Sequence, residues 1–218
     1  VKIKPGVLEL FESFPELASI GTPEQYSQYL DTVFPNSKIK DILYHGTADY
    51  KLGDVISDFQ ERALYLASKE MASSYKRKGV ILPVIINSQV SYNAPELIGE
   101  VPETLSLRKD QLKNAKLAQQ NKGILAINRG IYINENIALA PVDIEYYSNE
   151  NEYSNRANER FKSLNKEELN EFIKFLENRI SEIEAGRPID SFTTRADGDP
   201  EDFYGVFDTK NVLFLGSK

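Results

Sequence analysis

Short apolar runs separated by polar turns recur along the chain, and they predict several strands. The strongest run covers residues 80–87, where Pro83 indicates an edge or bulge position because proline cannot donate to a sheet ladder. Shorter runs at 42–47, 63–67 and 124–127 predict further strands. The segment 203–215 also has β-like character, and we expect a hairpin turn at residues 208–211.

Other segments repeat apolar residues at helical spacing and begin with capping residues. Thr22-Pro23-Glu24-Gln25 is a helix start, and the helix should end before Pro35. Ser68 and Asn165 are predicted caps of two more helices, the second carrying an apolar stripe that must be buried and ending near Gly186. The stretch 6–20 is helix-like, and 105–120 predicts a helix whose charges form a solvated face.

The polar segments between these elements set the expected organisation. Residues 48–62, 88–104 and 187–201 read as loops, and 148–163 reads as a linker or exposed segment. We therefore predict an α+β fold with a core domain at 1–148. Residues 149–218 should form an appendage of linker, amphipathic helix and β-like segment that packs on the core.

Composition narrows the classes of function. The 218 residues are 41% hydrophobic, which is enough for a core, and the net charge of −7 disfavours binding to double-stranded nucleic acid. No apolar run is long enough to span a membrane, and the first residues lack a signal-peptide core. The chain does not begin with methionine, so we expect a processed or excised piece of a longer protein.

The numbers of cysteines and histidines exclude several kinds of metal and catalytic site. The chain has no cysteine and one histidine, which excludes thiolate or histidine-rich metal sites and leaves a hydrolytic triad possible only through His45. No metal is therefore expected. A Walker loop and a Gly-x-Gly-x-x-Gly motif are both missing, so a nucleotide would not be held in the Rossmann manner.

One stretch combines an apolar strand with the single histidine. Tyr44-His45-Gly46-Thr47 follows two apolar residues, and glycine allows a ligand to approach the backbone closely. Tyr65 ends the next strand and Tyr75 lies about two turns into the following helix, so the two rings could clamp a flat aromatic ring. Alternatively, His45 is a structural histidine and both tyrosines are ordinary core or surface residues.

This series of motifs resembles the NAD-dependent ADP-ribosyltransferases of the diphtheria-toxin and PARP type. That family has a His-Gly-Thr-like strand end, a Tyr-Phe-Ala-like strand, a second tyrosine and a late glutamate. Here they correspond to His45-Gly46-Thr47, Tyr65-Leu66-Ala67, Tyr75 and Glu135, which opens an apolar stretch running to Pro141 and Ile144. The layout also resembles the modules of this family in polyvalent proteins of phages and mobile elements.

The resemblance implies a split β-sheet core with flanking helices, and NAD as co-substrate. It implies that His45 hydrogen-bonds the adenosine-side ribose, assisted by Thr47, and that Gly46 offers its backbone to the nicotinamide amide. Tyr65 and Tyr75 would stack on the nicotinamide. Glu135 would bind the ribose 2′-hydroxyl and stabilise the cation, with Glu145 as its competitor for that role and a surface glutamate as the alternative.

Three functional hypotheses follow from the resemblance. The first is a mono-ADP-ribosyltransferase, a phage or bacterial effector acting on a macromolecular acceptor, for which we expect a host protein in the bacterial cytoplasm. The second is an NAD glycohydrolase, and the third an inactive interaction module. Ile133 stands two residues before Glu135, where the arginine-modifying branch has a glutamate, so arginine modification is not expected. The spacing from Tyr65 to Tyr75 is one residue shorter than the family's.

Overall fold

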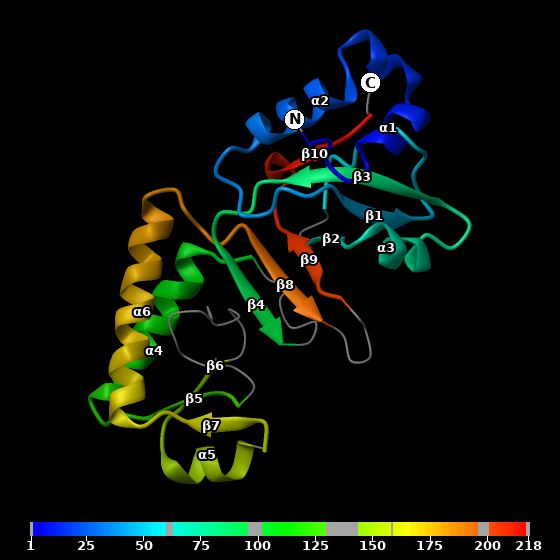
Figure 1. Cartoon of the computed structure of the whole chain (residues 1–218). Coiled ribbons are helices and arrows are strands. Elements are labelled where there is room, and N and C mark those ends of the chain that lie inside the picture. Colours follow the sequence, from blue (N-terminus) through cyan, green and yellow to red (C-terminus); the bar gives the residue numbers. More distant parts are fainter. Residues whose placement is uncertain are drawn as a thin grey trace. The chain divides into compact units, whose positions relative to one another are not determined.

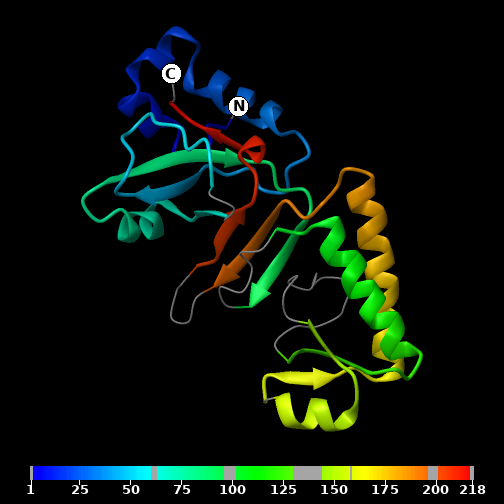
Figure 2. The same cartoon turned by 180° about the vertical axis from the view of Figure 1, so that it is seen from behind.

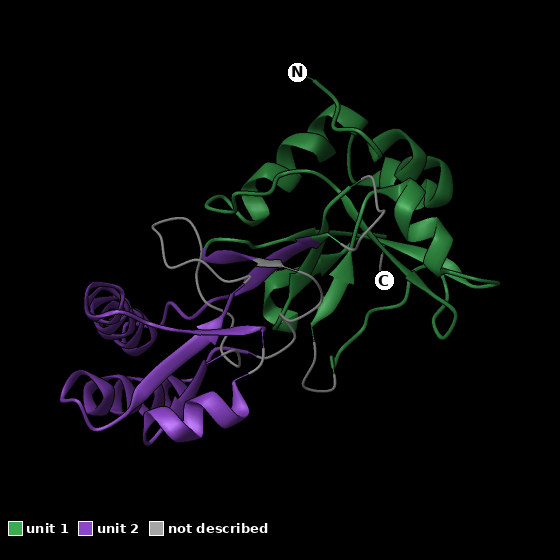
Figure 3. Cartoon of the chain, turned by 90° about the horizontal axis from the view of Figure 1, so that it is seen from below, with its two compact units in different colours: residues 1–89, 195–218 green, residues 90–194 purple. Residues whose placement is uncertain are grey.

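A computed structural model describes residues 2–59, 63–95, 102–129, 144–157, 159–195 and 201–216. The fold is mixed α+β, and the chain divides into two compact units, residues 1–89 with 195–218 and residues 90–194 (Figure 3). In the described part of the chain, helices fall short of the length and apolar character that crossing a membrane requires.

Unit 1 begins with helices that cover one face of a sheet (Figure 1). These are α1 (Val7–Ser13), the 3-10 helix η1 (Pro15–Ser19) and α2 (Pro23–Val33). Thr22 and Gln25 form the predicted capping box of α2. The helices pack through a buried apolar cluster, whose members include Val7, Leu10, Leu17, Tyr26, Leu30, Ile42, Ile85 and Leu215.

Two groups of strands complete unit 1. Strand β3 (Val80–Ile86) lies between β1 (Leu43–Thr47) and β10 (Val212–Phe214), antiparallel to both. Strand β2 (Leu64–Leu66) pairs antiparallel with β9 (Phe203–Val206). Helix α3 (Lys69–Tyr75) follows β2, and the side chain of Ser68 caps it by accepting from the Met71 amide, as predicted.

The prediction that Pro83 marks an edge or bulge is wrong, because β3 is the central strand. The Pro83 carbonyl accepts from the Leu215 amide, so the nitrogen of Pro83 also faces the β10 side. Strand β10 ends at Phe214, next to this position. The missing donor therefore falls where the pairing stops, and the ladder tolerates the proline there.

The predicted hairpin at 208–211 is also wrong. Strands β9 and β10 pair with β2 and β3 respectively, and do not pair with each other. Asp208 instead caps a short 3-10 helix, η2 (Thr209–Asn211), through the Lys210 amide. A turn does form at residues 208–211, but the partners of the two strands are distant in sequence.

Unit 2 is built on a pair of helices that lie side by side (Figures 1 and 2). Helix α4 (Leu105–Gln119) packs against α6 (Lys166–Glu184). Ion pairs Lys109–Glu184 and Lys116–Glu177 show that the two helices run antiparallel. The remaining elements are β4 (Ser91–Pro95), β5 (Ile124–Asn128), β6 (Ile144–Tyr147), α5 (Glu150–Arg156), β7 (Phe161–Ser163) and β8 (Ser191–Arg195).

Three segments predicted as loops or linker contain regular elements. Residues 148–163 hold α5, capped by Asn149, and β7, which pairs with β5. Residues 88–104 hold β4, and 187–201 hold β8, its neighbour in the sheet. The polar composition of these segments does not predict their strands. A strand gains much of its stability from a hydrogen-bonding partner, which here lies far away in the sequence.

The expected solvated face of α4 is wrong at Arg108. This side chain is fully buried, and its Nε atom donates to Glu103 at 2.8 Å. Arg179 of α6 reaches the same carboxylate at 2.7 Å, so one glutamate joins two arginines between the helices. Helix propensity and charge alone do not distinguish this arginine from its exposed neighbours.

The two compact units differ from the division predicted at residue 148. The apolar stripe of α6 is buried where this helix packs against α4. Its side chains include Leu169, Phe172, Ile173 and Leu176. Residues 90–148 therefore group with 149–194. The chain after 195 returns to unit 1, because β9 and β10 complete its strand pairs.

Candidate site around His45

Strand β1 presents different residues to the two sides of its sheet. Side chains alternate along a strand, so Leu43, His45 and Thr47 share one face and Tyr44 and Gly46 the other. On the first face, Leu43 belongs to a buried cluster that also contains Leu64, Leu66, Leu82, Val84 and Val206. The chain therefore holds His45 beside an apolar core, as the third of the five residues of β1.

Main-chain pairing between β1 and β2 is limited to one bridge. Tyr44 and Ala67 exchange two hydrogen bonds, of 2.9 and 3.0 Å. In a regular antiparallel ladder the next such pair would be Gly46 and Tyr65. The carbonyl of Tyr65 instead accepts from the Nδ1 atom of His45, at 2.8 Å. The histidine ring thus occupies the acceptor at the point where the two strands separate.

The hydrogen bond to Tyr65 fixes the proton on the histidine. A carbonyl oxygen only accepts, so Nδ1 must carry the hydrogen. Burial lowers the pKa of His45 below its usual value of 6.5, while the bond to the carbonyl opposes that change. The neutral ring keeps a lone pair on Nε2, which can accept a hydrogen bond from a hydroxyl group.

The packing of helix α3 requires a glycine at position 46. A Cβ atom at this position would lie 2.1 Å from the Ala72 carbonyl oxygen and 3.0 Å from the Lys76 nitrogen. Helix α3 therefore lies directly against the glycine. Because the main-chain groups of alternate residues point the same way, the N–H and C=O of Gly46 face the side of β2, as those of Tyr44 do.

The structure brings Tyr65 and Tyr75 to one side of the β2–β9 pair. Tyr65 lies opposite Gly205, so its side chain shares a face with Phe203, two residues before Gly205. The ring of Tyr75 packs edge-on against Phe203, with centroids 5.6 Å apart, and remains 54% exposed. Sequence reasoning missed Phe203, because its apolar segment carries no signal of the strand with which it pairs.

Thr47 has a structural task beside His45. Its side chain is buried, and its hydroxyl oxygen accepts from the Asp49 amide at 3.2 Å. This bond holds the turn that follows β1. The hydroxyl lies on the same face of β1 as the histidine ring, one strand position beyond Gly46.

The sequence offers two candidates for the catalytic carboxylate, Glu135 and Glu145. Glu135 lies in 130–143, outside the described residues. Glu145 is exposed on β6 in unit 2, and its carboxylate accepts a hydrogen bond from the Tyr147 hydroxyl. Burial and this bond together raise the pKa of Tyr147 to about 12. Glu145 thus has a partner within its own strand.

The chemistry offered by the described site is that of hydrogen bonding and ring stacking. Among the described residues, acidic and histidine side chains form no cluster of three or more that could hold a metal ion. The chain matches no family model, no curated protein and no solved structure with which it was compared.

Proposed function

We propose that this chain is an NAD-dependent mono-ADP-ribosyltransferase, with NAD bound where β1 and β2 separate and a split-sheet core of that family's type. The observation that carries the proposal is the bond from His45 Nδ1 to the Tyr65 carbonyl. It interrupts the pairing of β1 with β2 next to Gly46, whose main-chain groups face that side. A dinucleotide offers hydroxyl and amide groups suited to both residues.

The roles of the side chains follow from the charge that develops during reaction. Cleavage of the bond from ribose to nicotinamide leaves positive charge on the sugar, while the departing nicotinamide is neutral. The neutral His45 accepts from a ribose hydroxyl through Nε2, and Gly46 pairs with the nicotinamide amide. Tyr65 and Tyr75, with Phe203 beside them, supply aromatic surface for the nicotinamide ring.

Glu135 is the carboxylate to which we assign catalysis. A fixed negative charge near the developing cation stabilises the transition state more than the ground state. The acceptor in this proposal is a macromolecule, for which we favour a protein of a bacterial host, as for a phage or bacterial effector. An NAD glycohydrolase would use the same residues with water as the acceptor.

The test compares two glutamates, Glu135→Gln and Glu145→Gln, in the same chain. Nicotinamide release from NAD is measured together with transfer of labelled ADP-ribose to lysate proteins. Loss of Glu135 should lower turnover by about 10²–10³, or about 3–4 kcal/mol, whereas Glu145→Gln should change it little. Equal rates for wild type and Glu135→Gln would refute the catalytic assignment. Free ADP-ribose without labelled protein would identify a glycohydrolase.

The stacking role has a control of equal exposure. Tyr75 and Tyr29 are both 54% exposed, and each packs on one neighbouring ring, Phe203 and Tyr26 respectively. Tyr75→Ala should raise the Kd for NAD about tenfold, since stacking on one aromatic ring contributes on the order of 1 kcal/mol or more. Tyr29→Ala should leave the Kd unchanged. If both variants bind NAD as the wild type does, Tyr75 does not touch the ligand.

A further inference from the structure

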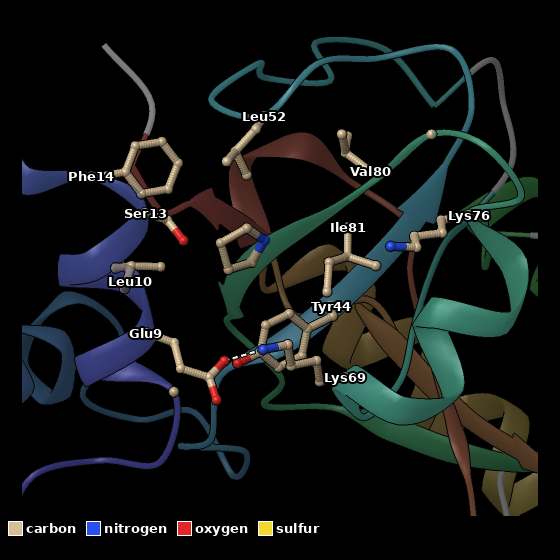
Figure 4. Close-up of a pocket in the computed structure, with 13 residues that line it drawn as sticks. Glu9, Leu10, Ser13, Phe14, Tyr44, Leu52, Lys69, Lys76, Val80 and Ile81 are labelled. Atoms are coloured by element: carbon tan, nitrogen blue, oxygen red, sulfur yellow. Dashed lines mark hydrogen bonds and ion pairs between the residues drawn. The ribbon is translucent and has the colours of Figure 1, made fainter.

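Unit 1 contains a cavity that the histidine site does not use. It has a volume of about 250 Å³ and lies between α1, α3 and the β1–β3 pair (Figure 4). Tyr44 lines it, and Tyr44 faces the opposite side of β1 from His45. The cavity is therefore distinct from any ligand position beside the histidine ring.

Two lysines of the α3 segment border the cavity, and their partners differ. Lys69 is ion-paired with Glu9 of α1. Lys76, one position beyond the end of α3, is half-buried, and its ammonium group makes no hydrogen bond or ion pair with the described residues. Figure 4 shows its ammonium group directed toward Ile81. A half-buried ammonium without a carboxylate is a ready partner for an anion.

The Tyr44 hydroxyl adds a neutral donor. Burial first, and then the negative charge of Glu9, raise the pKa of Tyr44, so the hydroxyl keeps its proton at neutral pH. Gly6 lies close to this hydroxyl, because a Cβ atom on Gly6 would lie 2.5 Å from the Tyr44 oxygen. The hydroxyl can donate to a ligand that carries an acceptor group.

The rest of the wall is largely apolar. Leu10, Leu52, Ile81 and Pro83 line it together with the Phe14 ring. Sites for drug-sized ligands occupy roughly 300–1,000 Å³, so a cavity of about 250 Å³ suits a smaller molecule. The combination requires one anionic group for Lys76 and a compact hydrocarbon body for the apolar wall.

We propose that this cavity is a binding site for a small organic monocarboxylate. The carboxylate pairs with Lys76, and the hydrocarbon part lies against Ile81, Pro83 and Leu10. Glu9 lowers the affinity of the cavity for anions, because its carboxylate neutralises Lys69 and repels a second negative charge. This inference does not depend on NAD binding, since it involves the other face of β1.

The test uses cyclohexanecarboxylate as the probe and cyclohexylmethanol as its uncharged analogue. Binding is followed by amide chemical shifts in the wild-type chain. The carboxylate should bind saturably, with a Kd in the millimolar range or below, and shift the amides of Tyr44 and Ile81. The alcohol should bind about tenfold more weakly, because it cannot form the charged pair. Absence of saturable carboxylate binding would overturn the proposal.

Three variants sharpen the result. Lys76→Met keeps the length of the side chain and should weaken carboxylate binding about tenfold. Lys78→Met, at an exposed lysine outside the cavity, is the matched control and should leave the Kd unchanged. Glu9→Gln should strengthen binding severalfold by freeing Lys69. Equal Kd values for Lys76→Met and Lys78→Met, or weaker binding by Glu9→Gln, would contradict the assignment.

Discussion

The two units bury ionisable groups in different ways. In unit 2 the carboxylate of Glu103 accepts from Arg108 at 2.8 Å, from Arg179 at 2.7 and 3.0 Å, and from the Ile189 amide at 2.9 Å. In unit 1, among the residues that the structure describes, the ring of His45 has one hydrogen bond, to the Tyr65 carbonyl. The first group is saturated by its neighbours, and the second retains an acceptor atom.

The shifts in pKa have different causes in the two places. Burial acts to raise the pKa of Glu103, but the hydrogen bond from Arg179 and the charge of Arg108 outweigh it, so the pKa is lowered and the group stays ionised. For His45 burial itself lowers the pKa, and the ring becomes neutral. A charge satisfied within the fold contributes to specific packing, whereas a neutral ring with a free lone pair can serve a ligand.

The largest effect is expected on removing the charge of Glu103. Glu103→Gln would remove the carboxylate that pairs with Arg108 and Arg179, and breaking such a buried pair costs about 3–5 kcal/mol in the free energy of unfolding. Urea denaturation measures this. Glu177→Gln, which breaks an exposed pair with Lys116, is the control and should cost at most about 1 kcal/mol. Equal losses in the two variants would show that the buried cluster contributes no more to stability than an exposed ion pair does.

The next effect concerns the packing of α3 on Gly46. In Gly46→Ala the new methyl group meets the Ala72 carbonyl, which belongs to the backbone and cannot rotate away. We expect a loss of about 1–3 kcal/mol in the free energy of unfolding, as for overpacking elsewhere. Ser74→Ala, at an exposed position of the same helix, should stay within about 0.5 kcal/mol of the wild type. An unchanged stability of Gly46→Ala would contradict the close approach of α3.

The smallest effect is the pH dependence due to His45. Because the chain has a single histidine, its imidazole NMR signal is unambiguous, and the titration midpoint should lie below 6.5. The unfolded chain then binds the proton more readily, so His45 leaves stability intact above pH 6.5. Below pH 6.5 the stability falls until the ring of the folded chain is protonated as well. His45→Asn, which can still donate to Tyr65, should remove this slope. A midpoint at or above 6.5 would contradict the neutral ring.

Elements with local signals were predicted from the sequence. Thr22, Ser68 and Asn165 cap their helices by bonds to the residue three positions later, and that geometry needs no distant partner. The apolar runs at β1, β2, β3 and β5 were also predicted as strands, because their hydrophobic content is higher than that of the flanking segments. The position of His45 within β1 belongs to this group.

Pairings between distant segments could not be predicted. The return of β9 and β10 to unit 1, and the closeness of Phe203 to Tyr75, depend on which strands meet after collapse. The burial of Arg108 depends on a carboxylate and on Arg179, which lie in other segments. The sequence by itself determined α2, α3 and α6 with their caps, the helix α4, and the strands β1, β2, β3 and β5. Only the tertiary structure decided which polar groups lost contact with water, because burial is a property of the neighbours that each residue acquires.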